Sequence, residues 1–217
     1  MVTNDILNRA KQNGIRVTPL ILRIRGVEEN KLNPYFLTGF TEGEGSFGLY
    51  FQKNSKYRSG YQVKLDFTIS VHEKDRAILE DINLYFNSVG KIYKQGDQAF
   101  KYKVSSIKGL AMILEHFDKY PLITHKQADY LLFKRAVQIL QQKKHLAPPL
   151  LWRESVSEIL SIKASMNLGL SEELKIAFPN IIPVLRPLVQ PSIIPFSPLF
   201  KYRGSGNWLA GFVSAAP

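Results

Sequence analysis

The chain of 217 residues contains no cysteine. This absence excludes disulfide bonds, thiolate metal sites and cysteine nucleophiles together. It also means that the protein does not require an oxidising compartment in order to fold.

Acidic residues and long apolar runs are scarce as well. The 18 Asp and Glu residues face 29 Lys and Arg residues, which gives a net charge of +11 and an isoelectric point near 9.7. Such an excess favours a polyanionic partner, either nucleic acid or an anionic membrane surface. No apolar run reaches the roughly 20 residues that a membrane-spanning helix needs, so we do not expect a membrane protein. The length allows one or two domains with a sizeable core.

The stretch 33–47 carries the strongest local signals. Asn33 can cap a helix, and Pro34 suits the first turn. The following residues are mostly apolar, which predicts a mostly buried helix. Gly39 and Gly43 lie four residues apart on one face, so the backbone of a second helix can approach closely there.

This predicted helix ends in two carboxylates, Glu42 and Glu44, which stand between glycines. The negative end of the helix dipole lies at this position, where acidic side chains are electrostatically unfavourable. Two interpretations remain open. The acids form either a solvated helix end or a functional site, such as one that holds a divalent cation.

The segment LTGFTEGEG at 37–45 resembles the motif that names the LAGLIDADG homing endonucleases. Other segments resemble the single-chain, two-domain members that organellar introns encode: GYQVKLDFTISVHEKD at 60–75, HFDKYPLITHKQADYLLFKR at 116–135, MNLGLSEELKIAFP at 166–179, and NWLAGFV at 207–213 as the start of a second motif. The resemblance implies an α+β fold, a LAGLIDADG homing-endonuclease-like domain. Two antiparallel β-hairpins would form an open DNA-binding saddle, and helices would back it.

Period-two alternation after 44 agrees with this expectation. Phe47, Leu49 and Phe51 alternate with Gly48, Tyr50 and Gln52, and the same pattern recurs at 61–71 and 91–104. The polar faces are the predicted DNA-binding surface, because amides pair with adenine and lysines donate to guanine or phosphate. An ordinary solvated sheet face is the alternative. The predicted surface comprises Gly48, Tyr50, Gln52, Asn54, Gln62, Lys64, Asp66, Thr68, Ser70, Lys91, Tyr93, Gln95, Lys101 and Lys103.

Helices are predicted at 74–86, 107–146 and 151–165. In the helix at 125–145, we expect an inward stripe of Tyr130, Leu131, Phe133, Val137 and Leu140. Most of its basic residues, Lys126 and Lys134 among them, are expected to form a solvated face.

Four regions follow: a basic N-terminal extension (1–30), a LAGLIDADG domain (31–170), a proline-rich extended linker (171–206) and a truncated second motif (207–217). The linker's prolines alternate with apolar residues, which predicts an extended segment against apolar surface. The N-terminal extension is a mitochondrial targeting segment, a phosphate-tracking arm or a remnant of upstream coding sequence. The first interpretation and the family resemblance predict a mitochondrial location.

The resemblance also implies a catalytic arrangement in which each of two motifs supplies one acid at the interface of their helices. The acids hold magnesium ions near the scissile phosphates. Here Glu44 is the implied catalytic and metal-binding acid, the carbonyl of Gly43 is a second ligand, and Lys103 is the candidate for orienting water. In the second motif, Gly211 repeats Gly39, whereas Ala216 stands at the position of Glu44.

We therefore expect 209–213 to occupy the groove beside the first helix and to leave a chain that binds DNA but cleaves it poorly. The missing half would come from longer coding sequence or from a second copy of the chain. The main hypothesis is a magnesium-dependent endonuclease acting on double-stranded DNA. One alternative is a non-cleaving module, such as a maturase or ribonucleoprotein component that binds intron or ribosomal RNA. A purely structural basic protein is the alternative that the sequence favours least.

Overall fold

The structure is a computed structural model that describes residues 32–57, 60–143, 149–189 and 205–215. The predicted N-terminal extension, part of the predicted linker and Ala216 lie outside the described residues. Within the described ranges, no helix is long and apolar enough to cross a bilayer.

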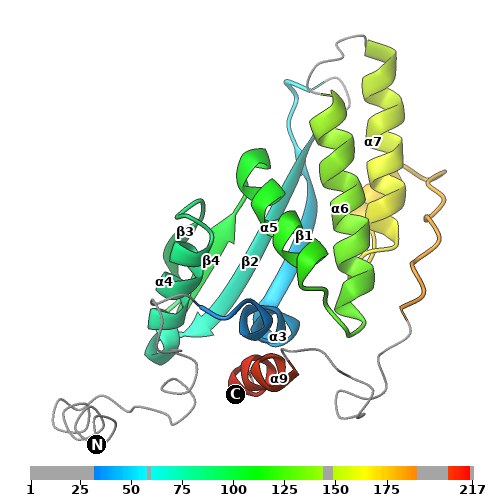
Figure 1. The fold of residues 1–217 in the computed structure, drawn as a ribbon. Helices are drawn as coiled ribbons and strands as arrows, with labels where there is room; N and C mark the ends of the chain where they lie inside the picture. The colour runs from blue at the N-terminus through cyan, green and yellow to red at the C-terminus, as the bar shows by residue number, and fades with distance from the viewer. Residues whose placement is uncertain (1–31, 58–59, 144–148, 190–204, 216–217) are drawn as a thin grey trace, which may run out of the picture.

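A four-stranded antiparallel sheet forms the centre of the fold (Figure 1). Its strands are β1 (Gly45–Lys53), β2 (Tyr61–His72), β3 (Lys91–Gln95) and β4 (Ala99–Val104), in the order β1-β2-β4-β3. Strands β1 and β2 form one hairpin, β3 and β4 form the other, and β2 pairs with β4 to join them. The predicted pair of hairpins is therefore confirmed.

Helices cover one face of this sheet, with α5 and α6 lying across it in Figure 1. This layering confirms the predicted α+β class. The helices are α3 (Pro34–Glu44), α4 (Arg76–Tyr85), α5 (Ile107–Lys119), α6 (Lys126–Lys143), α7 (Pro149–Ala164), α8 (Glu172–Ala177) and α9 (Ser205–Ser214).

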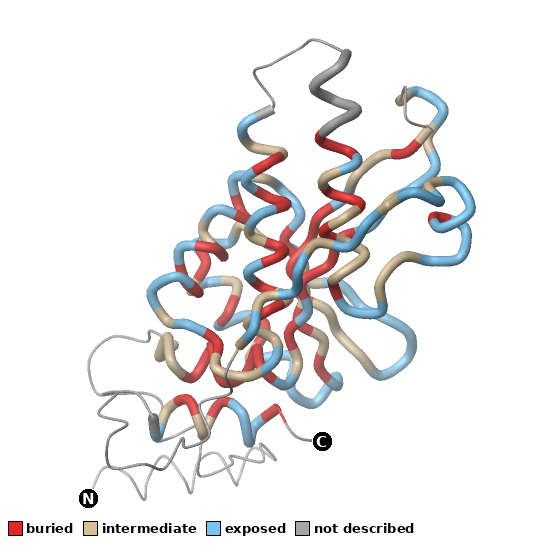
Figure 2. The backbone as a smooth tube through the Cα atoms, turned by 90° about the vertical axis from the view of Figure 1, so that its right-hand side faces the viewer, coloured by how far each residue is buried: buried red, intermediate tan, exposed pale blue. Residues whose placement is uncertain are grey.

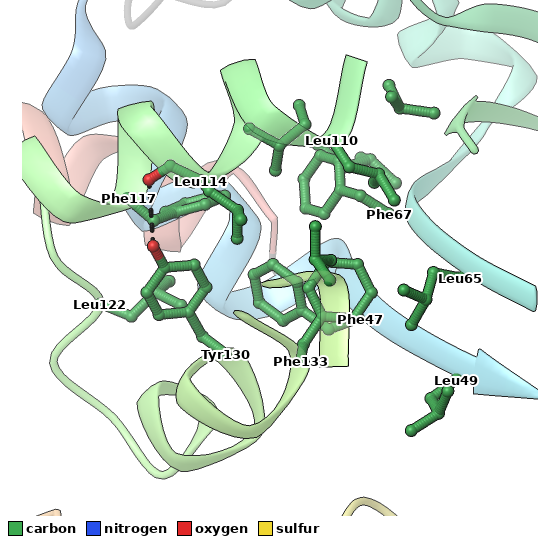
Figure 3. Packing of buried hydrophobic residues seen from close by; sticks show 14 of the residues in the cluster. Phe47, Leu49, Leu65, Phe67, Leu110, Leu114, Phe117, Leu122, Tyr130 and Phe133 are labelled. Carbon is green, nitrogen blue, oxygen red and sulfur yellow. Dashed lines mark hydrogen bonds between the residues drawn. The ribbon is translucent and has the colours of Figure 1, made fainter. Parts of the chain in front are cut away.

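The core lies between the helices and the inward face of the sheet, where buried segments of both layers meet (Figure 2). Phe47 is its centre. The Phe47 ring lies 5.4 Å from the rings of Phe67 and Phe133 and 5.5 Å from those of Phe117 and Tyr130, so it joins two strands to α5 and α6 (Figure 3). The hydroxyl of Tyr130 donates to the Leu114 carbonyl at 3.0 Å, which satisfies the polar tip of this buried ring.

The predicted inward stripe of α6 is wrong at one position. Leu131 is 38% exposed, whereas its neighbour Leu132 is buried. The rings of Tyr130 and Phe133 both point into the core. Leu131 lies about 200° around the helix from Phe133, so it faces outward when Phe133 faces inward.

The linker agrees with the prediction only in part. Ile181 and Val184 pack against buried apolar clusters, whereas Ile182, Leu185 and Leu188 are 80%, 92% and 96% exposed. Polar contacts also hold this segment. The amide of Val184 donates to the Ser161 carbonyl at 3.1 Å. The guanidinium of Arg186 contacts both carboxylate oxygens of Asp129, at 2.8 and 3.0 Å.

A buried histidine joins three helices. His116 on α5 is 4% exposed, with Nε2 3.1 Å from the Thr38 hydroxyl and Nδ1 2.9 Å from the Tyr85 hydroxyl. The Thr38 hydroxyl donates to the Tyr120 carbonyl, so Nε2–H donates to Thr38 and Nδ1 accepts from Tyr85. Burial lowers the pKa of His116 to about 3, and the imidazole is therefore neutral at pH 7.

This histidine makes stability depend on pH. Because the folded-state pKa lies below the unfolded value near 6.5, the stabilisation is complete above pH 6.5 and is lost as pH falls toward 3. We expect His116 to lower the free energy of unfolding by about 2 kcal/mol between pH 7 and pH 5. Urea unfolding at a series of pH values measures this. His116→Gln should flatten the profile, whereas His125→Gln, at an exposed position, should not. Parallel profiles for the unmodified chain and His116→Gln would contradict the assignment.

Candidate nucleic-acid interface and acidic corner

Helix α3 leads directly into strand β1, and Glu44 is its last residue. At its start, Asn33 Oδ1 accepts from the amides of Tyr35 at 2.9 Å and Phe36 at 3.3 Å. The cap and the proline that follows fix where the helix begins. Since β1 begins at Gly45, Glu44 lies at the corner between the core helix and the sheet.

The two acids of this corner have different environments. Glu42 is 7% exposed, and its carboxylate accepts from the amides of Ile123 at 2.6 Å and Thr124 at 3.1 Å, and from the Thr124 hydroxyl. It therefore holds the segment that leads into α6. Both interpretations from the sequence are therefore wrong for Glu42: its carboxylate is not solvated, and its hydrogen bonds leave it unavailable to a cation.

Lys126 neutralises the negative end of α3. Its ammonium donates to the carbonyls of Thr41 at 2.9 Å and Gly45 at 2.5 Å, as the helix dipole favours at a C-terminus. Burial lowers the pKa of Lys126, and the nearby Glu42, Glu44 and Asp129 oppose that shift. The expectation of a solvated basic face is wrong for this residue. The sequence around Lys126 does not distinguish it from the other lysines of the helix. Its contacts are with Thr41 and Gly45, a segment about 80 residues earlier.

Glu44 lines a hollow between the sheet and α9. The hollow also contains Ser70, Asp75 and Ala215. Burial raises the pKa of the Glu44 carboxyl, Lys126 lowers it and Asp75 raises it. Glu44 is half-buried and lines this hollow, whereas the carboxylate of Glu42 is engaged in the structure.

The donor set of this corner fits the protein's part of a divalent-cation site. Among the described residues, no three His, Asp or Glu side chains cluster as a complete metal site. Magnesium keeps several waters and usually takes one or two protein carboxylates plus phosphate oxygens. Glu44 and the backbone carbonyl of Gly43, one of the last carbonyls that a helix leaves unpaired, fit as the protein's part of such a site.

Helix α9 packs alongside α3, with glycines at the points of contact (Figure 1). A Cβ on Gly39 would lie 1.9 Å from the Trp208 carbonyl oxygen, and one on Gly211 would lie 2.0 Å from the Phe36 carbonyl oxygen. Trp208 precedes Gly211 by three residues, as Phe36 precedes Gly39, so the two helices contact each other reciprocally. Gly43 lies against the side chain of Ala215, whose Cβ would be 2.4 Å from a Cβ on Gly43.

The predicted DNA-binding residues lie together on the face of the sheet opposite the core. Tyr50 pairs with Lys64, and Gln52 pairs with Gln62. Two rows cross the other strands: Ser70 with Lys101 and Tyr93, and Thr68 with Lys103 and Lys91. Gln95 lies at the end of β3, and Asn54 follows β1, where its amide donates to Gln62 at 3.5 Å.

Three members of this predicted set are more enclosed than the alternating pattern indicated. Gly48 and Asp66 are opposite each other and are buried, Asp66 to 4% exposure. The ammonium of Lys103 lies 2.6 Å from Asp66 Oδ2. Lys103 is therefore engaged within the sheet face, whereas Lys126 is the cation that lowers the pKa of Glu44. The alternation of polar and apolar residues could not predict that Asp66 is buried. Its burial depends on the diagonal pairing of Asp66 with Lys103, which the strand register decides.

Comparison with known proteins gives consistent results. The sequence profile described as LAGLIDADG endonuclease matches residues 37–137. "Probable intron-encoded endonuclease 2" of Neurospora crassa is 43% identical over 84% of this chain and 40% of its own length, and "Probable intron-encoded endonuclease 3" of the same organism is 36% identical over 85% and 32%. The crystal structure of the LAGLIDADG homing endonuclease I-GzeII in complex with its DNA target superposes with a TM-score of 0.74, at 42% identity.

That superposition covers 84% of this chain and 58% of I-GzeII. A structure of I-SmaMI bound to an uncleaved DNA target in the presence of calcium ions has a TM-score of 0.75 at 42% identity. The present chain thus spans less than half the length of these two curated relatives and somewhat over half of the solved structures.

The fold and the corner define an α+β protein with an open polar sheet and one accessible acid at a helix–helix interface. The chain is similar in sequence and in fold to the LAGLIDADG homing endonucleases, which confirms the resemblance seen in the sequence.

The contrast between the two acids can be measured. We expect Glu42→Gln to lower the free energy of unfolding by about 1.5–3 kcal/mol, because hydrogen bonds to a buried carboxylate are lost. Glu44→Gln should change it by less than about 0.5 kcal/mol, as is usual away from buried networks. Chemical denaturation of both variants at pH 7 gives the comparison. Equal losses would show that Glu44 is also a structural residue.

Proposed function

We propose that this chain is the half of a site-specific homing endonuclease that binds double-stranded DNA through the sheet and carries one catalytic acid, Glu44. The observation that carries the proposal is the single sheet face on which amide, hydroxyl and basic side chains lie together, next to the Glu44 corner. The DNA-bound state of solved relatives at 42% identity supports it. In this proposal, 31–170 is the DNA-binding domain, 171–206 connects it onward, and 207–217 begins the second motif.

Binding would depend on groove geometry and on charge. A two-stranded β-ribbon fits the major groove, and the two hairpins here present Tyr50, Lys64, Tyr93 and Lys101 on one side. Lysine contacts to phosphate supply affinity without sequence preference, and amide contacts to base edges supply the preference. The opposite face cannot take part, because α5 and α6 pack on it.

Catalysis would require one more acid than the chain places at this corner. Glu44 and the Gly43 carbonyl would hold a divalent cation, for which we propose magnesium. When bound, the cation would stabilise charge that develops on the scissile phosphate. Lys126 neutralises the end of α3 and lowers the pKa of Glu44, which burial raises. At the matching position of the second motif stands Ala216, whose side chain cannot bind a metal.

The missing acid would come from a second domain or from a second copy of the chain. A second copy would have to displace α9, because α9 occupies the glycine face of α3. We therefore propose a protein that binds DNA well and cleaves it poorly by itself. The relatives are named as intron-encoded, and one from Podospora anserina is placed in ND4 intron 1. We accordingly propose an origin in a mitochondrial intron and a mitochondrial location.

Duplex binding should depend steeply on salt. Each phosphate that a lysine neutralises releases counterions, so the affinity falls by about 10³-fold or more between 50 and 200 mM salt if six or more contacts form. Lys101→Ala should weaken binding to all sequences alike and lower the slope of log affinity against log salt by about one. Fluorescence anisotropy with a labelled duplex and with an RNA duplex of the same sequence measures both. Tighter binding to the RNA would favour the ribonucleoprotein alternative.

A cleavage assay distinguishes DNA binding from phosphodiester hydrolysis. With magnesium and a DNA target selected for binding, we expect little double-strand cleavage by the unmodified chain. Glu44→Gln should abolish any residual strand cleavage, while its duplex affinity stays within about threefold, since Glu44 lies beside the sheet face rather than on it. Gel assays of supercoiled and linear plasmid report nicking and double-strand cleavage separately. Efficient double-strand cleavage that Glu44→Gln abolishes would show that two chains assemble an active site.

A further inference from the structure

Four residues form a compact cluster at the middle of the open sheet face. Lys103 Nζ lies 2.6 Å from Asp66 Oδ2, and Asp66 pairs across the sheet with Gly48. A Cβ on Gly48 would lie 2.3 Å from Asp66 Oδ1 and 2.6 Å from the Tyr50 hydroxyl oxygen. The absence of a side chain at Gly48 therefore makes room for both the carboxylate and the phenol ring.

One oxygen of this cluster has no partner. Asp66 is 4% exposed, and its Oδ1 is buried without a hydrogen bond. A buried carboxylate oxygen that is left unpaired costs free energy, so its retention here calls for an explanation. The same carboxylate lines the hollow on the open face, together with Tyr50, Lys103 and Thr68.

The cluster is covered by a side chain that can move. Tyr50 is 50% exposed, and its ring lies across Gly48 beside Asp66. Rotation of an exposed tyrosine between rotamers is fast and has little cost. A ligand that enters the hollow can therefore displace the ring and reach Oδ1.

We propose that Asp66 and Lys103 form a subsite that recognises one G·C base pair in the major groove, with Asp66 Oδ1 accepting from the cytosine N4 amine and Lys103 donating to guanine O6 or N7. The proposal rests on the proposed duplex-DNA binding. In the major groove, the cytosine amine and guanine O6 are adjacent, and carboxylate and lysine are the side chains that match them. An adjacent acceptor and donor on the protein thus match an adjacent donor and acceptor on one base pair.

The electrostatics support this arrangement. The hydrogen bond that Lys103 donates to Asp66 raises the pKa of Lys103, so the ammonium stays charged and is held in place. A lysine whose charge is partly compensated by a carboxylate 2.6 Å away is a weak phosphate ligand, because that carboxylate repels the phosphate. Base recognition uses both members of the pair, whereas phosphate binding uses only one.

Lys101 is a matched control on the same strand. It lies two residues before Lys103 on β4 and on the same face, and it pairs with Ser70 and Tyr93 rather than with an acid. An uncompensated lysine at this place is suited to phosphate, which carries no sequence information directly. The two lysines should therefore differ in kind: Lys101 contributes affinity, and Lys103 contributes preference.

The experiment selects bound duplexes from a pool with a randomised region, using the full chain and the variants Asp66→Asn, Lys103→Met and Lys101→Met at one salt concentration. The unmodified chain should require G·C at one position by about tenfold or more. Asp66→Asn and Lys103→Met should each reduce that preference to within about threefold at this same position only. Lys101→Met should keep the preference and weaken binding to every duplex.

Gly48→Ala tests the same subsite without changing any charge. The added methyl would displace Asp66 Oδ1 or the Tyr50 ring, and we expect loss of preference at the same base pair. Thermal unfolding checks that each variant folds. Lys103→Met leaves Asp66 as an unpaired buried charge, which can destabilise the fold. The double variant Asp66→Asn/Lys103→Met removes both charges and gives the same readout.

Three results would overturn the inference: an unchanged preference in Asp66→Asn, a uniform loss of affinity in Lys103→Met, or a required A·T pair at the position that responds. Each of these results is obtained with an unmodified chain that binds duplex DNA, so it refutes only the subsite. A complete absence of duplex binding by the unmodified chain would instead refute the proposed function, and the subsite with it.

Discussion

The contact between the end of α3 and the start of α6 is the constraint on which the rest of the structure depends. A helix that ends inside a protein presents unpaired carbonyls and a negative dipole end, and here the next residue begins a core strand. Lys126 donates to two of these carbonyls, while Glu42 accepts from the backbone at the entry to α6. The α6 side donates in the first contact through Lys126, and the α3 side accepts with a side chain in the second through Glu42. Together the two contacts fix the corner at which Glu44 lies.

The corner in turn sets the relation between the chemistry and the surface proposed for DNA. Because β1 follows α3 without a connecting loop, any rotation of the helix moves the first strand of the sheet. Phe47, two residues into that strand, packs its ring against aromatic rings from β2, α5 and α6. Aromatic packing on one side of the strand thus holds Tyr50 and Gln52 on the other side in register with β2. A sheet built in this way presents its polar groups at nearly constant spacing, which recognition of base edges requires.

The reciprocal packing of α9 on α3 explains why glycine recurs in both helices. Gly39 and Gly211 each lie against a carbonyl of the opposite helix, and any side chain there would separate the two backbones. The same interface places Ala215 against Gly43, so Glu44 follows the last contact of this pair. In the sequence, Glu44 and Ala216 occupy equivalent positions of the two motifs.

The sequence by itself determined the order and type of the elements, because period-two alternation, the Asn-Pro helix start and the two pairs of spaced glycines are local signals. It also determined which face of each strand is polar, and its motifs indicated the family. Only the tertiary structure decided which of two similar acids is free, which of many lysines is buried, and that Asp66 pairs diagonally with Lys103. Those outcomes depend on contacts between residues about 40 to 80 positions apart. The physical reason is that desolvation and hydrogen bonding act between neighbours in space, and local patterns of sequence do not record which distant residues become neighbours.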